Sequence, residues 1–394
     1  MLDFSFALPT HIHFGESHLE RIGTLTKEQN AKRVLLVYGQ TSIKRLGLYD
    51  RILNQLKKED INVYEVSGVK PNPSFESVLE GRQKIFDHDI DFILAVGGGS
   101  VIDAAKAMSF SHLYDADKLW QRCFIDREEL KGALPLGCVV TLSGTGTETN
   151  GNSVITNEAT HEKWSVRSPL LRPVFGVIDP EIQQQAPHDY RIASAIDIMH
   201  HLFEQYFDTT EDTEVSDYLI VGLLKSVKTL IETILEGKET KGTRQNLAWA
   251  STLGLSFIFQ QGKKGEWASH RLSYVLTERY GVIHGYALTM VYPALLKTLY
   301  EDVPDKLERR LNFLGQELFE GQTGKAVIER MQAMFRAFGA PTTYREAGIQ
   351  ETFNDDDYFD LAGPGTAYGD VGTIVPINQT YASKIFKHID EKAT

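Results

Sequence analysis

The first half of the chain alternates short apolar runs, rich in β-branched residues, with amphipathic stretches of about a dozen residues. Strands joined by helices of this length form parallel sheets, because each connection must cross back over the sheet. The alternation predicts an α/β domain whose ligands gather where strand carboxyl ends meet helix amino ends. The predicted strands are 34–38, 63–66, 92–96 and 136–140, and the predicted helices include 47–59 and 74–86.

A glycine loop follows the third of these strands directly. It consists of Gly97, Gly98, Gly99 and Ser100 and leads into a segment of good helix formers that begins at Val101. Backbone N–H groups of such a loop can approach an anion closely, and the helix adds the positive end of its dipole, so a pyrophosphate would fit here. A tight turn without a ligand explains the same glycines, and the loop alone leaves both interpretations equally open.

A second glycine-rich loop covers residues 141–151, after the strand predicted at 136–140. Its spacing differs from that of a dinucleotide fingerprint, and no helical pattern follows it. The hydroxyls of Thr141, Thr145 and Thr147 are able to bind a ribose, a nicotinamide amide or phosphates. The composition alone favours a solvated turn.

The length of 394 residues exceeds a single typical core, which stops growing at roughly 250–300 residues, so we expect two domains. The composition changes after Asp179 and Pro180, where β-branched runs become rare. Helical periodicity then extends from about 189 to 353, with a clear amphipathic example at 212–236. We therefore expect an α/β domain at 1–182 and an all-α domain at 183–394.

Charge and composition limit the partners. The net charge of −12 disfavours nucleic-acid binding, because phosphate contacts need a basic surface. No apolar stretch approaches the roughly 20 residues that span a bilayer, and the first residues lack the basic start and apolar core of a secretory signal. The two cysteines, Cys123 and Cys138, do not form a C-x-x-C pair. We expect a cytoplasmic protein with small-molecule partners, no nucleic acid and no membrane.

An aspartate and three histidines stand at spacings that suit a metal site. Asp197 and His201 lie four residues apart in a helical segment, where they share one face and can bind one ion. His270 and His284 follow downstream, fourteen residues apart. Imidazole nitrogen and carboxylate oxygen suit Zn²⁺ and Fe²⁺, and a site with few protein ligands keeps a position for substrate.

Two further residues of the first helix bear on this site. His200, three residues after Asp197, competes with His201, and Glu204 is a candidate carboxylate for supporting a ligating histidine. A solvated face of an amphipathic helix is the simpler interpretation, and each histidine alone would more often be structural. Apolar residues flank the polar stripe, however, so the stripe would be buried and need partners.

Several separated segments resemble one family, the iron-containing alcohol dehydrogenases, and in particular their butanol dehydrogenase-like branch. The resemblance covers nearly the whole chain and implies a Rossmann-like amino-terminal domain with a helical carboxy-terminal domain, an architecture shared with dehydroquinate synthase. It rests on Pro9-Thr10 with Phe14-Gly15, on 97–106, 141–150 and 173–180, and on the aspartate and histidines. The metal ligands it implies are Asp197, His201, His270 and His284.

The resemblance also implies the chemistry. The expected reaction is hydride transfer between NAD(P)(H) and a short- to medium-chain alcohol or aldehyde such as butanol or butanal. One divalent metal, Fe²⁺ first and Zn²⁺ second, would activate the substrate oxygen. A homodimer is expected on the same ground. The residues expected at the cofactor are Gly39, Gln40, Ser42, Lys44, Gly97, Gly98, Gly99, Ser100, Asp103, Thr141, Thr145, Asn150 and Lys163.

The turn after the first predicted strand bears on the choice of cofactor. Family members that exclude the 2′-phosphate tend to carry an acidic residue where Gln40 stands, because its charge repels the phosphate. Ser42 and Lys44 can contact that phosphate instead, which favours NADP(H) while NAD(H) remains acceptable. An exposed lysine at a helix start is almost as good an explanation of Lys44.

One position departs from the family pattern. Family members usually have a further histidine, which is not a metal ligand, four residues after the ligand that corresponds to His270. That histidine is proposed to relay protons beside the nicotinamide, whereas this chain has Tyr274 at the position. A tyrosine hydroxyl can relay a proton, but its ordinary pKa near 10 makes it a poor base at neutral pH. Tyr274 is therefore the candidate catalytic residue and also the reason to consider a catalytically weakened cofactor- and metal-binding member.

Enzymes of different activity can share this architecture. A polyol or glycerol-phosphate dehydrogenase and a dehydroquinate synthase-like lyase are two such possibilities, although the butanol-branch motifs argue against them. A metal-dependent hydrolase would leave both glycine loops without a purpose. Trp267, Phe257 and Phe259 either line a substrate pocket or belong to the core.

Overall fold

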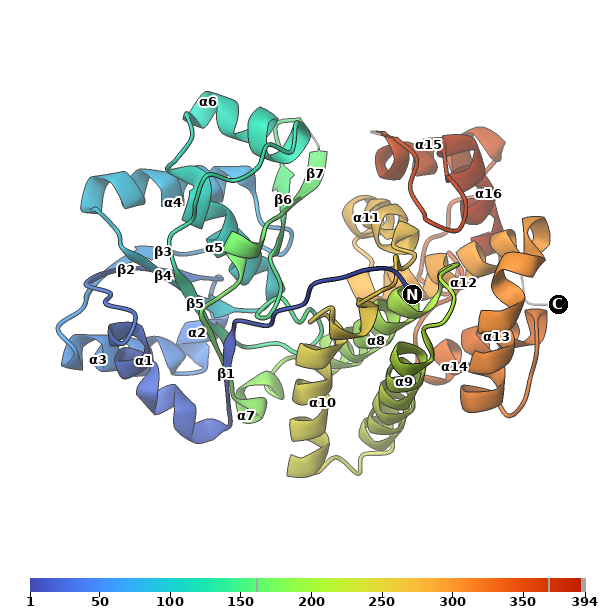
Figure 1. Cartoon of the computed structure of the whole chain (residues 1–394), viewed down its shortest axis with the longest axis horizontal. Coiled ribbons are helices and arrows are strands. Elements are labelled where there is room, and N and C mark those ends of the chain that lie inside the picture. The colour runs from blue at the N-terminus through green and yellow to red at the C-terminus, as the bar shows by residue number, and fades with distance from the viewer. Residues whose placement is uncertain (161, 368, 391–394) are drawn as a thin grey trace. The chain divides into compact units, whose positions relative to one another are not determined.

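The computed structural model describes residues 1–160, 162–367 and 369–390, which divide into two compact units (Figure 1). The α/β unit comprises Ala7–Ala186, and the helical unit comprises Met1–Phe6 with Pro187–Thr394. The α/β unit extends to Ala186, four residues beyond the expected boundary after residue 182, and Ile182 packs in its apolar core as that boundary allows. The first residues join the helical unit, where the backbone N–H of Leu2 donates to the carbonyl of Gly262 at 2.9 Å.

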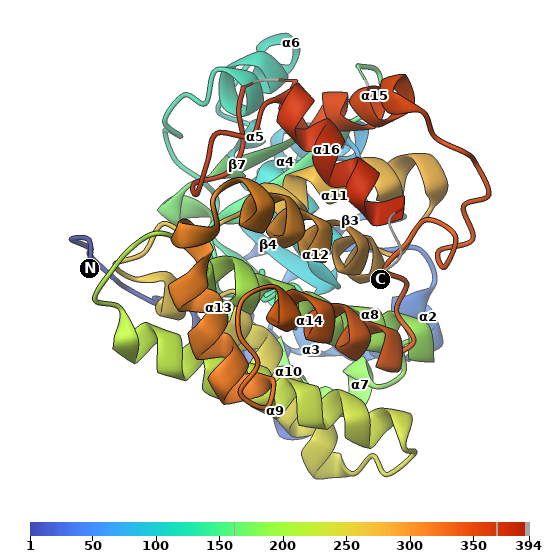
Figure 2. The same ribbon diagram turned by 90° about the vertical axis from the view of Figure 1, so that its right-hand side faces the viewer.

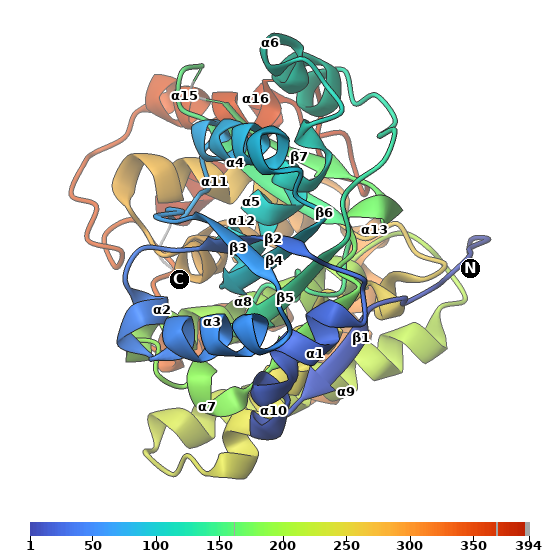
Figure 3. The same ribbon diagram turned by 90° about the vertical axis from the view of Figure 1, so that its left-hand side faces the viewer.

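Within the described part of the α/β unit, six strands form one parallel sheet in the order β1-β8-β5-β4-β2-β3. Strands β1 to β5 of this sheet are labelled in Figure 3. The bounds are β1 His11–Phe14, β2 Arg33–Tyr38, β3 Asn62–Val66, β4 Phe92–Gly97, β5 Leu136–Val140 and β8 Phe175–Ile178. The chain runs from β2 outward to β3 and returns to β4 on the other side of β2. Ligands of open α/β sheets bind at such a reversal of strand order.

Helices cover both faces of this sheet, α1 and α3 on one side and α4 and α5 on the other (Figure 1). Alternate residues of β2, such as Val34 and Leu36, pack with Ile52 and Leu56 of α3, as the period of two in a strand requires. The bounds are η1 Glu16–Arg21, α1 Ile22–Lys27, α2 Ser42–Arg45, α3 Leu48–Lys58, α4 Phe75–His88, α5 Gly99–Ser111, α6 Ala116–Leu119, η2 Trp120–Ile125, η3 Pro169–Leu171 and α7 Pro180–Gln183.

An antiparallel hairpin follows the second glycine loop. It consists of β6 (Asn152–Asn157) and β7 (Glu162–Arg167). The sequence pattern did not predict this hairpin or the strands β1 and β8. These last two strands have four residues each, too few to show a periodic pattern.

The second unit is built of helices (Figure 2). Their buried apolar side chains form one core cluster. The bounds are α8 His188–Tyr206, α9 Glu214–Leu235, α10 Lys241–Gly254, η4 Ile258–Gln260, α11 Ala268–Tyr280, α12 His284–Asp302, α13 Pro304–Leu318, α14 Lys325–Ala337, α15 Asp355–Thr366 and α16 Gln379–Asp390. Helix α8 packs against α9, α10 and α12 and is buried along most of its length. The predicted fold class, a parallel α/β domain followed by a helical domain, is confirmed.

In the described ranges, no helix combines the length and apolar character needed to cross a membrane.

Candidate metal centre and cofactor-binding loops

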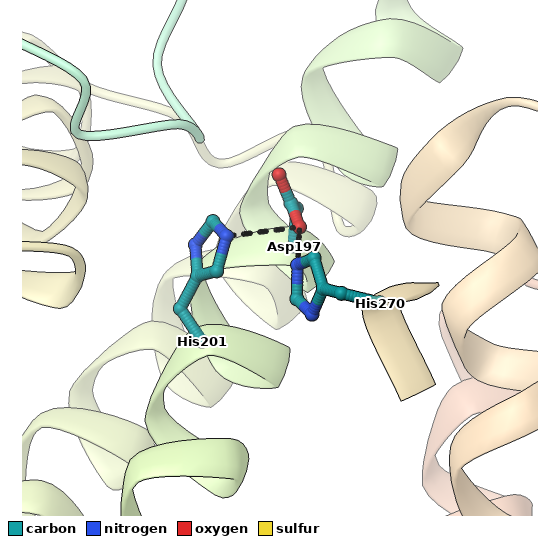
Figure 4. A group of neighbouring side chains, drawn as sticks. All are labelled: Asp197, His201 and His270. Carbon is teal, nitrogen blue, oxygen red and sulfur yellow. Dashed lines mark ion pairs between the residues drawn. The ribbon is translucent and has the colours of Figure 1, made fainter. Parts of the chain in front are cut away.

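Helix α8 carries the first two candidate ligands. Asp197 and His201 lie one turn apart and face the same way, with Nε2 of His201 3.6 Å from Oδ1 of Asp197 (Figure 4). Their side chains are only 8% and 6% exposed. The helix holds them in this buried position because its apolar residues, such as Ile196 and Leu202, belong to the core of the unit.

Two other helix amino ends complete the group. His270 lies in the first turn of α11, and its Nε2 is 3.6 Å from Oδ1 of Asp197 (Figure 4). His284 begins α12, and its Nε2 is 3.9 Å from the same oxygen. The structure thus gathers three imidazoles around one carboxylate oxygen. The side chain of His284 is 33% exposed, so solvent reaches the group on its side.

This group fits a divalent metal. Oδ1 of Asp197 is buried without a hydrogen-bond partner among the described residues, and the separations of 3.6–3.9 Å are too long for hydrogen bonds. Ligands placed 2.1 Å from one tetrahedral ion would be about 3.4 Å apart, which is close to the observed spacing. The ligand atoms of Asp197, His201 and His270 all lie within 4.8 Å of one another. Three nitrogens and one oxygen suit Fe²⁺ or Zn²⁺.

The charged groups of this cluster shift the pKa values of Asp197 and His270. Burial works to raise the pKa of Asp197, but the three neighbouring imidazoles, His201 first, hold that pKa well below its usual range. Burial works to lower the pKa of His270, but the negative charges of Glu204 and Asp197 raise it to about 10. Asp197 is therefore a carboxylate at neutral pH, which is the form that binds a metal.

His200, the alternative candidate to His201 as a metal ligand, points away from this group. Its ring is fully buried and stacks on Phe335 with the centroids 4.9 Å apart, while Tyr292 contacts it edge-on at 5.4 Å. Neither ring nitrogen has a hydrogen-bond partner in the described part of the chain, and burial lowers the pKa of His200 well below its ordinary value. His200 is a neutral core residue.

Aromatic side chains lie beside the candidate ligands. The ring of Trp267 is 5.8 Å from that of His270, and Phe257 packs on Trp267 at 5.7 Å. Phe257 has a backbone φ of +60°, a value that bulky residues rarely adopt and that marks a constrained position. The half-buried ring of Tyr274 lies 5.9 Å from that of His284. Phe259 belongs to the apolar core instead.

The predicted cofactor loops lie at one edge of the parallel sheet. The segment 39–44 runs from the end of β2 into α2, the glycine segment 97–100 runs from the last residue of β4 into α5, and the loop at 141–151 follows β5. Strands β2 and β4 pair with Tyr38 opposite Val96, and the N–H of Thr141 donates to the carbonyl of Gly97 at 3.0 Å. All three loops therefore meet at the carboxyl ends of neighbouring strands, where ligands of this fold class bind.

The three glycines of the first loop differ in what the protein itself requires. A Cβ on Gly97 would lie 2.6 Å from Cβ of Val101, and one on Gly99 would lie 2.6 Å from Cγ2 of Thr145, so packing excludes a side chain at both. A Cβ on Gly98 would meet Leu142 at an ordinary 3.4 Å, and its φ of −81° suits any residue. Protein packing and backbone conformation therefore do not require a glycine at position 98.

The second loop is held by a buried lysine. Nζ of Lys106 donates to the carbonyl and the hydroxyl of Thr147, both at 2.7 Å, and to Oδ1 of Asn150 at 3.2 Å. The hydroxyl of Thr147 and the N–H of Val154 donate to the two carboxylate oxygens of Asp103 at 2.8 and 3.0 Å. Burial lowers the pKa of Lys106 to about 8. Asp103 and Asn150, both predicted at the cofactor, are thus engaged in bracing the loop.

Sequence reasoning gave Lys106 no role of its own. A lysine between the apolar residues of 101–110 was the available signal, since a buried cation needs several acceptors.

The remaining predicted cofactor residues lie around the same loops. Gln40 and Ser42 are exposed, and Nζ of Lys44 lies over the ring of Tyr49 at 4.9 Å. The hydroxyl of Thr145 is buried beside Gly99 without a hydrogen-bond partner among the described residues, as a group that binds a ligand would be. Nζ of Lys163, in β7, donates to Oδ1 of Asn72 at 2.8 Å. Gly39 directly follows β2, and Ser100 lies in the first turn of α5.

Comparisons of the sequence and of the structure with known proteins point to the same family. The family model for iron-containing alcohol dehydrogenases matches residues 9–180, and the carboxy-terminal model of the Fe-containing alcohol dehydrogenase family matches residues 191–387. A Bacillus subtilis protein described as probable NADH-dependent butanol dehydrogenase 2 is 36% identical over 96% of this chain and 97% of its own. The NADPH-dependent aldehyde reductase YqhD of Escherichia coli is 32% identical over 89% of this chain and 90% of its own. A crystal structure of NADH-dependent butanol dehydrogenase A from Thermotoga maritima has a TM-score of 0.91 at 34% identity and covers 99% of both chains.

Proposed function

The chain belongs to the iron-containing alcohol dehydrogenase family, and we propose that it reduces short- to medium-chain aldehydes of the butanal type, and oxidises the matching alcohols, with NAD(P)(H). The observation that carries this proposal is the convergence of three imidazoles on Oδ1 of Asp197, a buried oxygen with no hydrogen-bond partner among the described residues. Fe²⁺ is the proposed metal, with Zn²⁺ as the second choice.

The chain's own residues have distinct tasks in this reaction. Asp197, His201, His270 and His284 hold the metal, and the loops at 97–100 and 141–151 hold the cofactor. When bound, the metal supplies Lewis-acid polarisation of the substrate oxygen and the nicotinamide supplies or accepts hydride. Trp267, half-buried beside His270, offers an apolar wall to an alkyl chain and restricts water.

Tyr274 is the proposed proton relay. Its ring is 5.9 Å from that of His284, and it occupies the side of the group that solvent reaches. Its hydroxyl can pass a proton between substrate oxygen and solvent, although slowly compared with an imidazole. A catalytically weakened protein that only binds cofactor and metal is the alternative.

NADP(H) is the proposed preferred cofactor, with NAD(H) accepted. No carboxylate stands at Gln40 to repel a 2′-phosphate, and Lys44 lies four residues further on, within α2. Its ammonium is held over the ring of Tyr49, whose hydroxyl donates to Glu65 at 2.7 Å. A lysine held in this way places a cation four residues after Gln40, where a 2′-phosphate is proposed to bind.

We further propose a homodimer in the cytoplasm. Alternate residues of the extended amino-terminal segment expose apolar side chains that a second copy would cover. These residues are Leu2, Phe4, Phe6 and Leu8, with exposures of 44, 55, 37 and 39%. The two cysteines are buried and free, as a reducing compartment permits.

The first test is butanal reduction by anaerobically purified protein. The protein is stripped of metal, reconstituted separately with Fe²⁺ and Zn²⁺, and supplied with NADPH or NADH while cofactor absorbance is followed. We expect metal-dependent oxidation of the cofactor, faster with Fe²⁺ and with a higher kcat/KM for NADPH. A Tyr274→Phe variant in the same assay should lower kcat by about tenfold or more if the hydroxyl relays protons.

The same assay distinguishes a working dehydrogenase from a protein that only binds its cofactors. Absence of turnover with every metal, although metal and cofactor bind, would contradict the dehydrogenase and favour the weakened binding protein. A kcat/KM that is higher for NADH would overturn the cofactor preference alone. Wild-type rates in Tyr274→Phe would remove Tyr274 from the mechanism.

A further inference from the structure

The imidazole of His270 lies between two carboxylates. Its Nε2 faces Oδ1 of Asp197 at 3.6 Å, and its Nδ1 is in ion-pair contact with Oε2 of Glu204. The Glu204 side chain is fully buried. A buried carboxylate is costly unless it is paired and hydrogen-bonded, so Glu204 must find its partners at this place.

Glu204 lies on the same stripe of α8 as the two ligands of that helix. Asp197, His201 and Glu204 are spaced four and three residues apart, which puts them on one face. The first two point to the metal group, and Glu204, one turn further, meets the beginning of α11. One helix therefore supplies two ligands and the support of a third.

The second oxygen of Glu204 ties down the helix that carries His270. Oε1 accepts from the hydroxyl of Ser269 and from the backbone N–H of His270, the latter at 3.2 Å. The N-cap residue of α11, Trp267, provides no side-chain cap, so a carboxylate from another helix satisfies this N–H. The positive end of the α11 dipole also favours the negative charge of Glu204.

We propose that Glu204 is a positioning residue for the metal centre. One of its carboxylate oxygens binds Nδ1 of His270 and the other accepts hydrogen bonds from the first turn of α11, so Nε2 of His270 stays directed at the metal. A ring with Nδ1–H bonded to a carboxylate has its Nε2 lone pair available for coordination, and such support strengthens metal binding. The inference rests on the proposed metal-dependent function, which supplies the ion.

The chain contains a matched control. Glu266 is also a fully buried carboxylate at the amino end of α11, where it accepts from the N–H of Ala268 at 3.2 Å. It also accepts from the N–H groups of Thr373 and Ile374, at 2.6 and 2.9 Å. Glu266 therefore anchors the same helix end through backbone groups of residues that are not metal ligands. A purely structural role for Glu204 would make the two carboxylates equivalent.

The experiment compares Glu204→Gln with Glu266→Gln in the full-length protein. The measurements are the Kd for Zn²⁺, by competition with a chromophoric chelator, the visible spectrum of the Co²⁺ form, and the melting temperature without metal. We expect Glu204→Gln to weaken Zn²⁺ binding by about 10–100-fold and to alter the Co²⁺ spectrum. Glu266→Gln should lower the melting temperature while leaving the Zn²⁺ Kd within about threefold of the wild-type value.

Two results would overturn the proposal: wild-type Zn²⁺ affinity and Co²⁺ spectrum in Glu204→Gln, or an equal loss of affinity in Glu266→Gln. If Glu204→Gln does not fold, Glu204→Asp keeps the charge and withdraws the carboxylate from Nδ1, and the same loss of affinity is expected. Wild-type protein that binds none of the metals would instead overturn the proposed function. Histidine ¹⁵N shifts of the Zn²⁺ form add a direct readout, because the bonding of Nδ1 in His270 should change in Glu204→Gln and stay unchanged in Glu266→Gln.

Discussion

At the scale of single residues, two adjacent histidines have opposite environments. His201 faces Asp197 across 3.6 Å, whereas His200 stacks on Phe335 and finds no hydrogen-bond partner among the described residues for either ring nitrogen. Successive residues of a helix point about 100° apart, so one lines the polar group and the other enters the core. Sequence spacing alone permits either histidine to pair with Asp197.

This contrast gives a matched pair of variants. His201→Ala should abolish metal retention after dialysis and turnover, because one of four ligands is lost. His200→Phe should retain both, with a melting temperature equal to or above the wild-type value, because an apolar ring replaces one whose nitrogens are buried without partners. Metal analysis and thermal unfolding of both variants provide the measurement, and loss of metal in His200→Phe would refute the assignment.

At the scale of elements, the turn from β4 into α5 combines two kinds of glycine. Gly99 is required by the protein, since a Cβ there would lie 2.8 Å from the hydroxyl oxygen of Thr145. Gly98 has room for a side chain and an unstrained backbone. The amino end of α5, with Gly98 as its N-cap and no side-chain cap, offers N–H groups to an anion.

Alanine at each position should separate packing from ligand binding. Gly99→Ala should destabilise the fold by about 1–3 kcal/mol through overpacking against Thr145. Gly98→Ala should leave the melting temperature within a degree or two of wild type. It should raise the Kd for NADPH by roughly tenfold, about 1.4 kcal/mol, because the added methyl would lie where we propose that the diphosphate binds. Fluorescence titration with NADPH measures the second effect, and an unchanged Kd would show that the cofactor does not approach Gly98.

At the scale of the whole molecule, the two units carry different candidate sites. The candidate metal ligands come from α8, α11 and α12 of the helical unit, and the cofactor loops from the sheet edge of the α/β unit. The helical unit also contains a buried cluster of charges. Arg310 of α13 pairs with Asp208 at 3.1 Å and with Asp217, and Lys263 pairs with Asp217 at 2.7 Å.

Arg310 should be a major determinant of stability. Its side chain is 2% exposed, and its replacement by methionine would leave Asp208 and Asp217 buried beside Lys263 as their remaining cation in this cluster. We expect Arg310→Met to destabilise the helical unit by about 3–5 kcal/mol. Arg309→Met is the control: Arg309 donates to the carbonyl of Thr210 at 3.0 Å in an exposed position, and its loss should cost about 0.5 kcal/mol or less. Thermal unfolding of the two variants in parallel decides, and equal melting temperatures would contradict the expectation.

The amino-acid sequence by itself determined the family, which the family models confirm, and the fold class, as well as most elements of the sheet. Predicted strands at 34–38, 63–66, 92–96 and 136–140 agree with β2, β3, β4 and β5 to within one residue at each end. These features depend on local periodicity, which is written along the chain and needs no knowledge of distant contacts.

Only the tertiary structure decided which polar groups meet. It engaged Asp103 and Asn150 in the brace formed by Lys106, and it gave His270 a second carboxylate, Glu204, at the end of α8. It also tied the first six residues to the helical unit. These hydrogen bonds and ion pairs join residues more than forty positions apart in the sequence. Packing of the elements decides which faces meet, and a buried charged or polar group must then find its partner on the facing element.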